Sequence, residues 1–172
     1  ADGEPIIGPS KDMVLGVYYL SMSNGDTKKP EELRTFIDMQ EVEMAYHLGQ
    51  VGVHDPIRIR VTTWYDDENS RLEEAEERII ETTVGRVLLN MILAPEIQFV
   101  NYTMDKGGIK DLIAELLEVT GDEKAATEVA DRIKDIGCSY ATNSGTTIAI
   151  ADISIPPEKL DIVSQAMEEE QA

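Results

Sequence analysis

Three short stretches place polar or charged side chains where local structure does not fully explain them. Lys11-Asp12 opens an expected helix, where the aspartate suits the helix dipole and the lysine does not. Residues 82–86, Thr-Thr-Val-Gly-Arg, bring an arginine into the first turn of another expected helix. Residues 143–147 gather small hydrogen-bonding side chains at a third junction. These stretches are either turns and caps or the lining of one shared polar cavity. The candidate site residues are Lys11, Asp12, Thr82, Thr83, Arg86 and Ser144.

The sequence does not predict a self-sufficient catalytic or metal site. Only Cys138 could join His47 and His54 as a zinc ligand, which is fewer than the converging ligands that such a site uses. The G-x-S-x-G nucleophile turn and the glycine-rich phosphate loops are both absent. No carboxylate is embedded in an apolar run that would raise its pKa for acid catalysis. We therefore expect no catalytic residue and no metal site in this segment.

Composition describes a globular chain of ordinary apolar content and strong negative charge. Of its 172 residues 42% are apolar and 28% charged, and 34 acidic against 15 basic residues give a net charge of −19. Such a charge repels phosphate backbones, so the segment alone is not expected to hold DNA or RNA. No apolar run approaches the roughly 20 residues of a membrane-spanning helix. The single cysteine cannot form an internal disulfide, which indicates a reducing compartment, the cytoplasm.

Two short helices are expected near the start of the sequence. Ser10 precedes apolar residues at helical spacing, and its hydroxyl can cap that helix. Asp38 and Glu41 have the spacing of a capping box. They begin a helix predicted over residues 39–48, which Gly49 ends.

A β-hairpin is expected in the middle of the chain. Residues 57–64 alternate apolar and polar side chains, as a strand with one buried face does. A second strand is predicted over 78–83, with the acidic residues between them forming the hairpin loop as a solvated surface.

The second half of the sequence is predominantly helical in its spacing. Together with the hairpin, this order predicts the α+β class, with short helices and a small antiparallel sheet. The expected elements are a helix from Val84 ended by Pro95, a helix over 109–119 closed by Gly121, a helix over 123–136 stopped by Gly137, a strand over 146–155 and a last helix that begins at Pro156 and Pro157.

Four blocks of sequence resemble one known family. They are GEPIIGPSKDMVLGVYYL (3–20), ETTVGRVLLNMIL (81–93), FVNYTMDKGGIKDLI (99–113) and IKDIGCSYATNSGTTIAIADISIPPEK (133–159). In this order they resemble the beta-prime, or largest, subunit of bacterial-type DNA-directed RNA polymerase. The resemblance implies an internal fragment of that subunit, with residues 1–156 in its pore region and 157–172 at the start of the funnel or rim helical hairpin.

The resemblance also implies a function and partners. The pore region borders the secondary channel, through which nucleoside triphosphates reach the catalytic site and into which backtracked RNA is extruded. The implied partners are the rest of beta-prime, the beta, alpha, omega and sigma subunits, template DNA and RNA in the intact enzyme, and Gre-type factors at the channel rim.

Catalysis is expected to depend on residues outside this segment. The family's Asn-Ala-Asp-Phe-Asp-Gly-Asp loop, which binds the catalytic Mg²⁺, is not in the sequence, and two-metal phosphoryl transfer needs such carboxylates. The resemblance thus implies a nucleotidyltransferase as the whole enzyme, while this segment alone should be inactive. One departure concerns Lys11, which stands where many relatives have glutamine, so the contacts of that glutamine are not transferred to it.

Two other functions are alternatives to this interpretation. An autonomous acidic protein-interaction module would recruit basic partners through its surface charge. Its gene would begin near Ala1, whereas a polymerase fragment would be flanked by the aspartate loop and the bridge helix. A small hydrolase lacks a nucleophile and base pair in this sequence.

Overall fold

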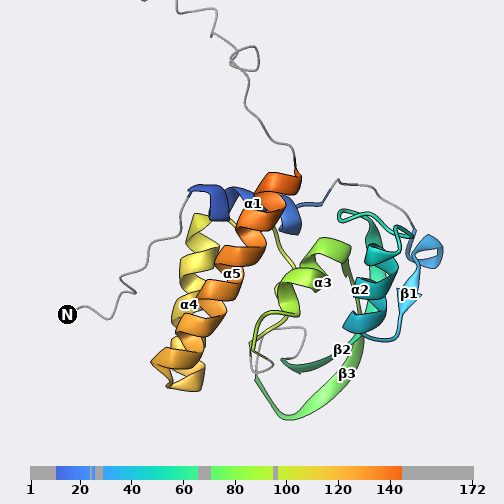
Figure 1. Cartoon of the computed structure of the whole chain (residues 1–172). Coiled ribbons are helices and arrows are strands. Elements are labelled where there is room, and N and C mark those ends of the chain that lie inside the picture. Colours follow the sequence, from blue (N-terminus) through green and yellow to red (C-terminus); the bar gives the residue numbers. More distant parts are fainter. Residues whose placement is uncertain (1–10, 24, 26–28, 66–70, 95–96, 145–172) are drawn as a thin grey trace, which may run out of the picture.

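The structure of the protein is a computed structural model, shown in Figure 1, which describes residues 11–23, 25, 29–65, 71–94 and 97–144. Five α-helices, one short 3₁₀ helix (Pro30–Glu32) and three strands lie within these residues. The α+β class is therefore confirmed. The predicted cap at Ser10, the strand over 146–155 and the last helix lie outside the described residues.

The sheet has the order β1-β2-β3. Strands β2 (Pro56–Tyr65) and β3 (Arg71–Thr83) form the predicted antiparallel pair, in register from Pro56 opposite Thr83 to Tyr65 opposite Arg71. Strand β1 (Thr35–Phe36) was not predicted, because two residues are too few to show an alternation. It pairs parallel to β2, so the sheet is mixed instead of purely antiparallel.

The predicted hairpin loop was wrong in its extent. Glu76 and Glu77 lie within β3, opposite Thr63 and Thr62 of β2. Figure 1 shows that this end of the hairpin extends beyond the helices. Because the glutamates there are exposed, this half of the strand can be rich in acidic residues, and hydrophobic alternation does not reveal it.

Helices α2 (Met39–His47) and α3 (Val84–Asn90) lie beside the sheet. The capping box of α2 is confirmed: the Asp38 carboxylate accepts from the Glu41 N–H at 2.8 Å. The Glu41 carboxylate in turn accepts from the Ile37 N–H at 2.8 Å. Helix α3 is shorter than predicted, because Asn90 ends it and uses its side chain to bind the segment that follows.

Helices α4 (Lys106–Thr120) and α5 (Glu123–Asn143) form an antiparallel pair, which α1 (Lys11–Ser21) crosses (Figure 1). Gly121 ends α4 as predicted, with φ of 62°. Gly137 does not stop α5, which continues for six further residues to Asn143. It is buried where α1 crosses, and a Cβ added at Gly16 would lie 1.7 Å from the Gly137 carbonyl oxygen.

Helix α3 connects the helices α1, α4 and α5 with the sheet and α2, because it contacts α1 on one side and α2 and β3 on the other. Burial of apolar surface is the main term that stabilises the fold. None of the helices built from the described residues combines the length and hydrophobicity that crossing a bilayer requires. The largest fully buried side chains are Phe36, Leu20, Ile57, Ile59, Leu89, Met104, Ile109, Leu116 and Ile133.

Candidate functional site

Arg86 is the centre of a polar network at the junction of α1, α3 and the segment before α4. Its Nε donates to the Ser21 carbonyl at 2.9 Å. Its Nη1 donates to the Asn101 carbonyl at 3.1 Å and to the Asn101 Oδ1 at 3.2 Å. We call Ser21, Arg86, Asn90 and Asn101 the Arg86 network. Through it, one side chain holds segments that are 65 and 15 residues away in sequence.

Two asparagines extend the network into the neighbouring backbone. The Asn90 side chain donates to the Arg86 carbonyl at 2.7 Å and to the Val100 carbonyl at 2.9 Å, and it accepts from the Val100 N–H at 2.8 Å. The Asn101 side chain donates to the Glu81 carbonyl at 2.8 Å. Residues 97–104 form neither a strand nor a helix, so hydrogen bonds from these side chains fix the path of their backbone.

Ser21 connects the end of α1 to the same segment. Its hydroxyl donates to the Val17 carbonyl at 2.7 Å and accepts from the Met104 N–H at 2.8 Å. Both Ser21 and Met104 are fully buried. A buried N–H without an acceptor is costly, so this serine stabilises the path of the backbone past α1.

The geometry explains the Thr-Thr-Val-Gly-Arg spacing in structural terms. Thr83 is the N-cap of α3 and its hydroxyl accepts from the Arg86 N–H at 3.4 Å. Gly85 donates to the Val53 carbonyl at 2.7 Å, and a Cβ at this position would lie 2.0 Å from the Leu20 carbonyl oxygen. Thr82 is also buried, and its hydroxyl has no hydrogen-bond partner among the described residues.

The charge of Arg86 is not balanced by a direct ion pair within the described part of the chain. Burial lowers the pKa of its guanidinium, which still remains charged near neutral pH because arginine ionises so far above it. All its acceptors are neutral carbonyl groups. A half-buried positive charge bound only by dipoles is able to attract an anion.

Lys11 and Asp12 lie at the other end of α1 from the network. Both are exposed, and ten helical rises separate Lys11 from Ser21, which is about 15 Å. Lys11 lines a hollow of about 370 Å³ together with Tyr18 of α1 and Lys106 of α4. The cations here stand out in a chain of net charge −19.

Ser144 follows the last residue of α5, as its C-cap, and its hydroxyl donates to the Ala141 carbonyl at 2.8 Å. The structure thus brings Thr82, Thr83 and Arg86 together, and separates them from Lys11 along the length of α1. The six candidates do not form a single compact cluster around the Arg86 network. Their expected role beside a nucleotide channel stays a prediction.

Sequence reasoning missed three members of the network: Ser21, Asn90 and Asn101. Asn90 had a visible signal, since it interrupts the apolar run from Val87 to Ala94. Ser21 had a weaker one, because it follows the buried positions of α1 and shares their face. Asn101 had no signal, since its partners come from distant segments.

Comparisons with known proteins agree with the resemblance found in the sequence. A family described as RNA polymerase Rpb1, domain 3, matches residues 1–153. Proteins named DNA-directed RNA polymerase subunit beta' are similar along nearly the whole chain. The one from Thermosipho africanus is 37% identical over 169 residues, which cover 96% of this chain and 9% of that protein.

Two further beta' subunits show the same relation. The protein from Symbiobacterium thermophilum is 36% identical over 179 residues, covering 98% of this chain and 15% of its own length. That from Syntrophomonas wolfei is 30% identical over 176 residues, covering 99% and 15%. This chain therefore spans between 9% and 15% of the length of these relatives. Because the family match covers 153 of the 172 residues, the chain belongs to the family of RNA polymerase Rpb1, domain 3.

Proposed function

We propose that this chain is the pore-region part of the largest subunit of a DNA-directed RNA polymerase, which makes RNA from nucleoside triphosphates on a DNA template. The observation that carries the proposal is the family match over residues 1–153, supported by its similarity to proteins named subunit beta'. In this proposal residues 1–156 form the pore region and 157–172 begin the funnel or rim hairpin.

The proposed task of the segment is to wall the secondary channel, which admits nucleoside triphosphates and receives backtracked RNA. Lys11 and Asp12 support this role because they are exposed at the start of α1. Arg86 supports it through a positive charge that no described acidic group pairs with directly, and Thr82, Thr83 and Ser144 would be polar neighbours along the wall. A cation can guide a triphosphate electrostatically without taking part in bond making.

The Arg86 network has a second part in this proposal, as the support of α1. Arg86 and Ser21 fix the last residue of that helix against α3 and residues 97–104. An α-helix of eleven residues is stiff. Because α1 is fixed at Ser21 and at its crossing with α5, the position of its first residue, Lys11, is also set. In this role Arg86 is a positioning residue for the start of α1.

Catalytic Mg²⁺ would be bound outside this segment, by aspartates of the intact enzyme. Within the described residues, no group of three or more His, Cys, Asp or Glu side chains is placed to hold a metal ion. The segment alone is proposed to be inactive. Its partners would be the rest of beta-prime, the beta, alpha, omega and sigma subunits, DNA and RNA through the intact enzyme, and Gre-type factors at the rim, all in the cytoplasm.

The test uses the full gene product assembled with its polymerase subunits. Lys11→Ala should raise the apparent KM for nucleoside triphosphates about threefold, or alter cleavage of backtracked complexes, because it removes a positive charge from the wall. Lys134→Ala is the matched control, since it removes an exposed lysine of α5 that bonds only with Asp131 in the described structure.

Arg86 is tested in the same assays with Arg86→Ala and Arg86→Lys. If neither variant changes the apparent KM or cleavage of backtracked RNA, the channel role of Arg86 is wrong. If the full gene product does not copurify with polymerase subunits at all, the proposed function itself is wrong.

A further inference from the structure

Among the described residues, the edge of β2 that pairs with β1 has no strand neighbour over its second half. Strand β1 pairs only with Arg58 and Ile59, whereas β2 continues to Tyr65. Among the strands that the structure describes, none lies beside β2 beyond Ile59 on this side. The chain turns away after β1, because Asp38 begins α2.

The backbone of Thr62 is directed toward this free edge. The Arg58 N–H donates to the Arg34 carbonyl at 2.9 Å, on the side of β1. Peptide groups of alternate residues point to the same side of a strand, so those of Thr62 point as those of Arg58 do and away from β3. Thr62 therefore presents an N–H and a C=O in strand geometry that β3 does not use. Such groups are a template for another strand.

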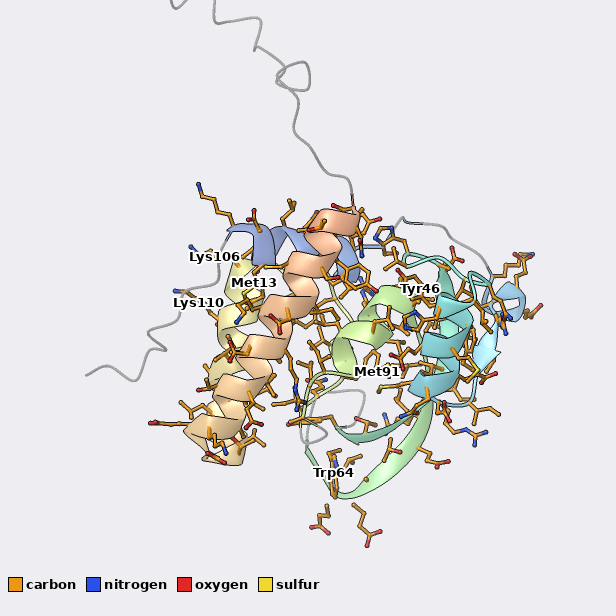
Figure 2. All side chains as sticks on the ribbon, viewed as in Figure 1. Met13, Tyr46, Trp64, Met91, Lys106 and Lys110 are labelled. Carbon is orange, nitrogen blue, oxygen red and sulfur yellow. The ribbon has the colours of Figure 1, made fainter. Side chains whose placement is uncertain are left out.

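A groove of about 370 Å³ opens at this edge of the sheet. Residues 60–62 of β2 form one side of it. Met39 at the start of α2 and Met91, Leu93 and Phe99 after α3 supply half-buried apolar walls. Figure 2 shows Met91 between α3 and α2. Free main-chain groups beside apolar walls are the features with which proteins bind an extended segment as an added strand.

The charges at the groove indicate an occupant of low net charge. Its described lining has one acidic residue, Asp38, and one basic residue, Arg60. The Asp38 carboxylate is engaged as the cap of α2. This balance contrasts with β3, which carries Glu73, Glu74, Glu76 and Glu77 at the opposite edge of the sheet. The groove thus offers main-chain hydrogen bonds and apolar contact, with no excess of either sign.

We infer that the groove binds an extended, apolar segment of the largest subunit from outside these 172 residues, which adds to the sheet beside Thr62. The inference rests on the proposed function. The relatives support the source of the segment, because 85% or more of their length lies outside the part that this chain matches. From Arg60 to Trp64 the free edge covers four strand steps, about 13 Å, which pairs with roughly five residues.

An alternative interpretation is that this edge binds no strand and that its features prevent unwanted pairing with another chain. Arg60 is an exposed charge, and the register with β3 shifts between Thr63 and Tyr65. Edge charges and irregularities are known means of preventing strand addition. The two readings differ in what happens to the Thr62 N–H when the subunit is complete.

Amide hydrogen exchange at Thr62 separates these readings. It is measured in the purified 172-residue chain and in the polymerase assembled from the full gene product. We expect the Thr62 amide to exchange at least tenfold more slowly in the assembled enzyme, because a strand partner accepts its hydrogen. The Val61 amide is the internal control, since it faces β3 and should be protected in both samples.

Two substitutions at the same position add a test of the hydrogen bond itself. Thr62→Pro removes the N–H that faces the groove and spares the bonds to β3, whereas Thr62→Ala retains that N–H. We expect Thr62→Pro to reduce incorporation of the subunit into polymerase about tenfold and Thr62→Ala to leave it unchanged. Circular dichroism of the 172-residue variants establishes that both fold.

The outcomes distinguish this inference from the proposed function. Copurification with polymerase subunits together with equal Thr62 exchange in both samples would overturn the groove and leave the proposed function standing. Equal loss of assembly with Thr62→Pro and Thr62→Ala would also overturn it, because the side chain would then be responsible. Absence of any copurification would overturn the proposed function and, with it, the source of the segment.

Discussion

Helix α1 and the outer half of the β2–β3 hairpin differ in how closely their backbones approach other elements. The backbone of α1 meets α5 at Gly16 and Gly137, and it meets α3 at Gly85, with no space for a Cβ at any of the three. In the hairpin beyond Val61, by contrast, the glutamates of β3 are exposed and Trp64 is 37% exposed. Figure 2 shows Trp64 at the end of the hairpin that lies away from the helices.

This difference indicates where the fold tolerates change. Around α1 the glycines leave no space for added atoms, and the Arg86 network holds the end of the helix by hydrogen bonds, so substitutions of these residues should unfold or displace the helix. In the outer hairpin, side chains meet water, and most substitutions should have little effect. In the proposed function Lys11, at the start of α1, meets substrate. The region that is least tolerant of substitution then also positions the end of α1 that carries this lysine.

The largest expected effect is that of Gly16→Ala. The added methyl group would lie 1.7 Å from the Gly137 carbonyl oxygen and 2.8 Å from the Ala141 nitrogen, so α1 and α5 would have to move apart. We expect the free energy of unfolding in urea to fall by about 3 kcal/mol or more. Gly107→Ala in α4 is the matched control, because its Cβ would meet only the Asp105 carboxylate within 4 Å, at 3.3 Å. Equal losses for the two variants would contradict the close crossing.

Arg86→Ala should have the next largest effect. It removes three hydrogen bonds and leaves the Ser21 and Asn101 carbonyls without their donor, which should cost about 2–4 kcal/mol of unfolding free energy. Arg86→Lys retains the charge and one donor, so it should recover part of the loss. Recovery of full stability by lysine would mean that charge, not the forked geometry of the guanidinium, holds α1.

Several parts of this fold were predictable because their causes are local. The capping box at Asp38 and the end of α4 at Gly121 depend on neighbours within four residues, and both were found in the structure. Gly121 ends a helix, whereas α5 continues through Gly137, because α1 packs against Gly137 from more than a hundred residues away in sequence. A glycine can permit a helix end or a helix crossing, and sequence spacing does not distinguish them.

The candidate site shows the same boundary between local and distant causes. The Thr-Thr-Val-Gly-Arg junction was recognised from its unfavourable arginine, and its capping threonine follows from local geometry. A positive charge is unfavourable at the start of a helix, and here the carbonyl groups of Ser21 and Asn101 stabilise it by accepting hydrogen bonds from Arg86. No rule of sequence spacing connects these two residues to Arg86. The acidic half of β3 was missed for a related reason, since its pairing with β2 defines it as a strand and its own pattern does not.

Ser21→Ala should have an intermediate effect and sharpens the comparison within the Arg86 network. The substitution leaves the buried Met104 N–H without its acceptor, and the loss should be about 1–2 kcal/mol in urea unfolding. Ser139→Ala, an exposed position on α5, is the control and should change stability by less than about 0.5 kcal/mol. Hydrogen exchange at Met104 should also become faster in Ser21→Ala and remain unchanged in the control.

The smallest expected effect is that of Glu77→Gln in the outer hairpin. Glu77 lies opposite Thr62 in the ladder and is exposed, and glutamine keeps its length while removing one of the many negative charges of the chain. Loss of a buried contact cannot follow, because none exists in the described structure, and reduced self-repulsion can only favour the compact state slightly. Urea unfolding should therefore shift by less than about 0.5 kcal/mol, and the shift should shrink further as salt is added. A loss above about 1 kcal/mol would mean that the outer hairpin is held by contacts of its own, and the contrast with α1 would no longer explain which region tolerates change.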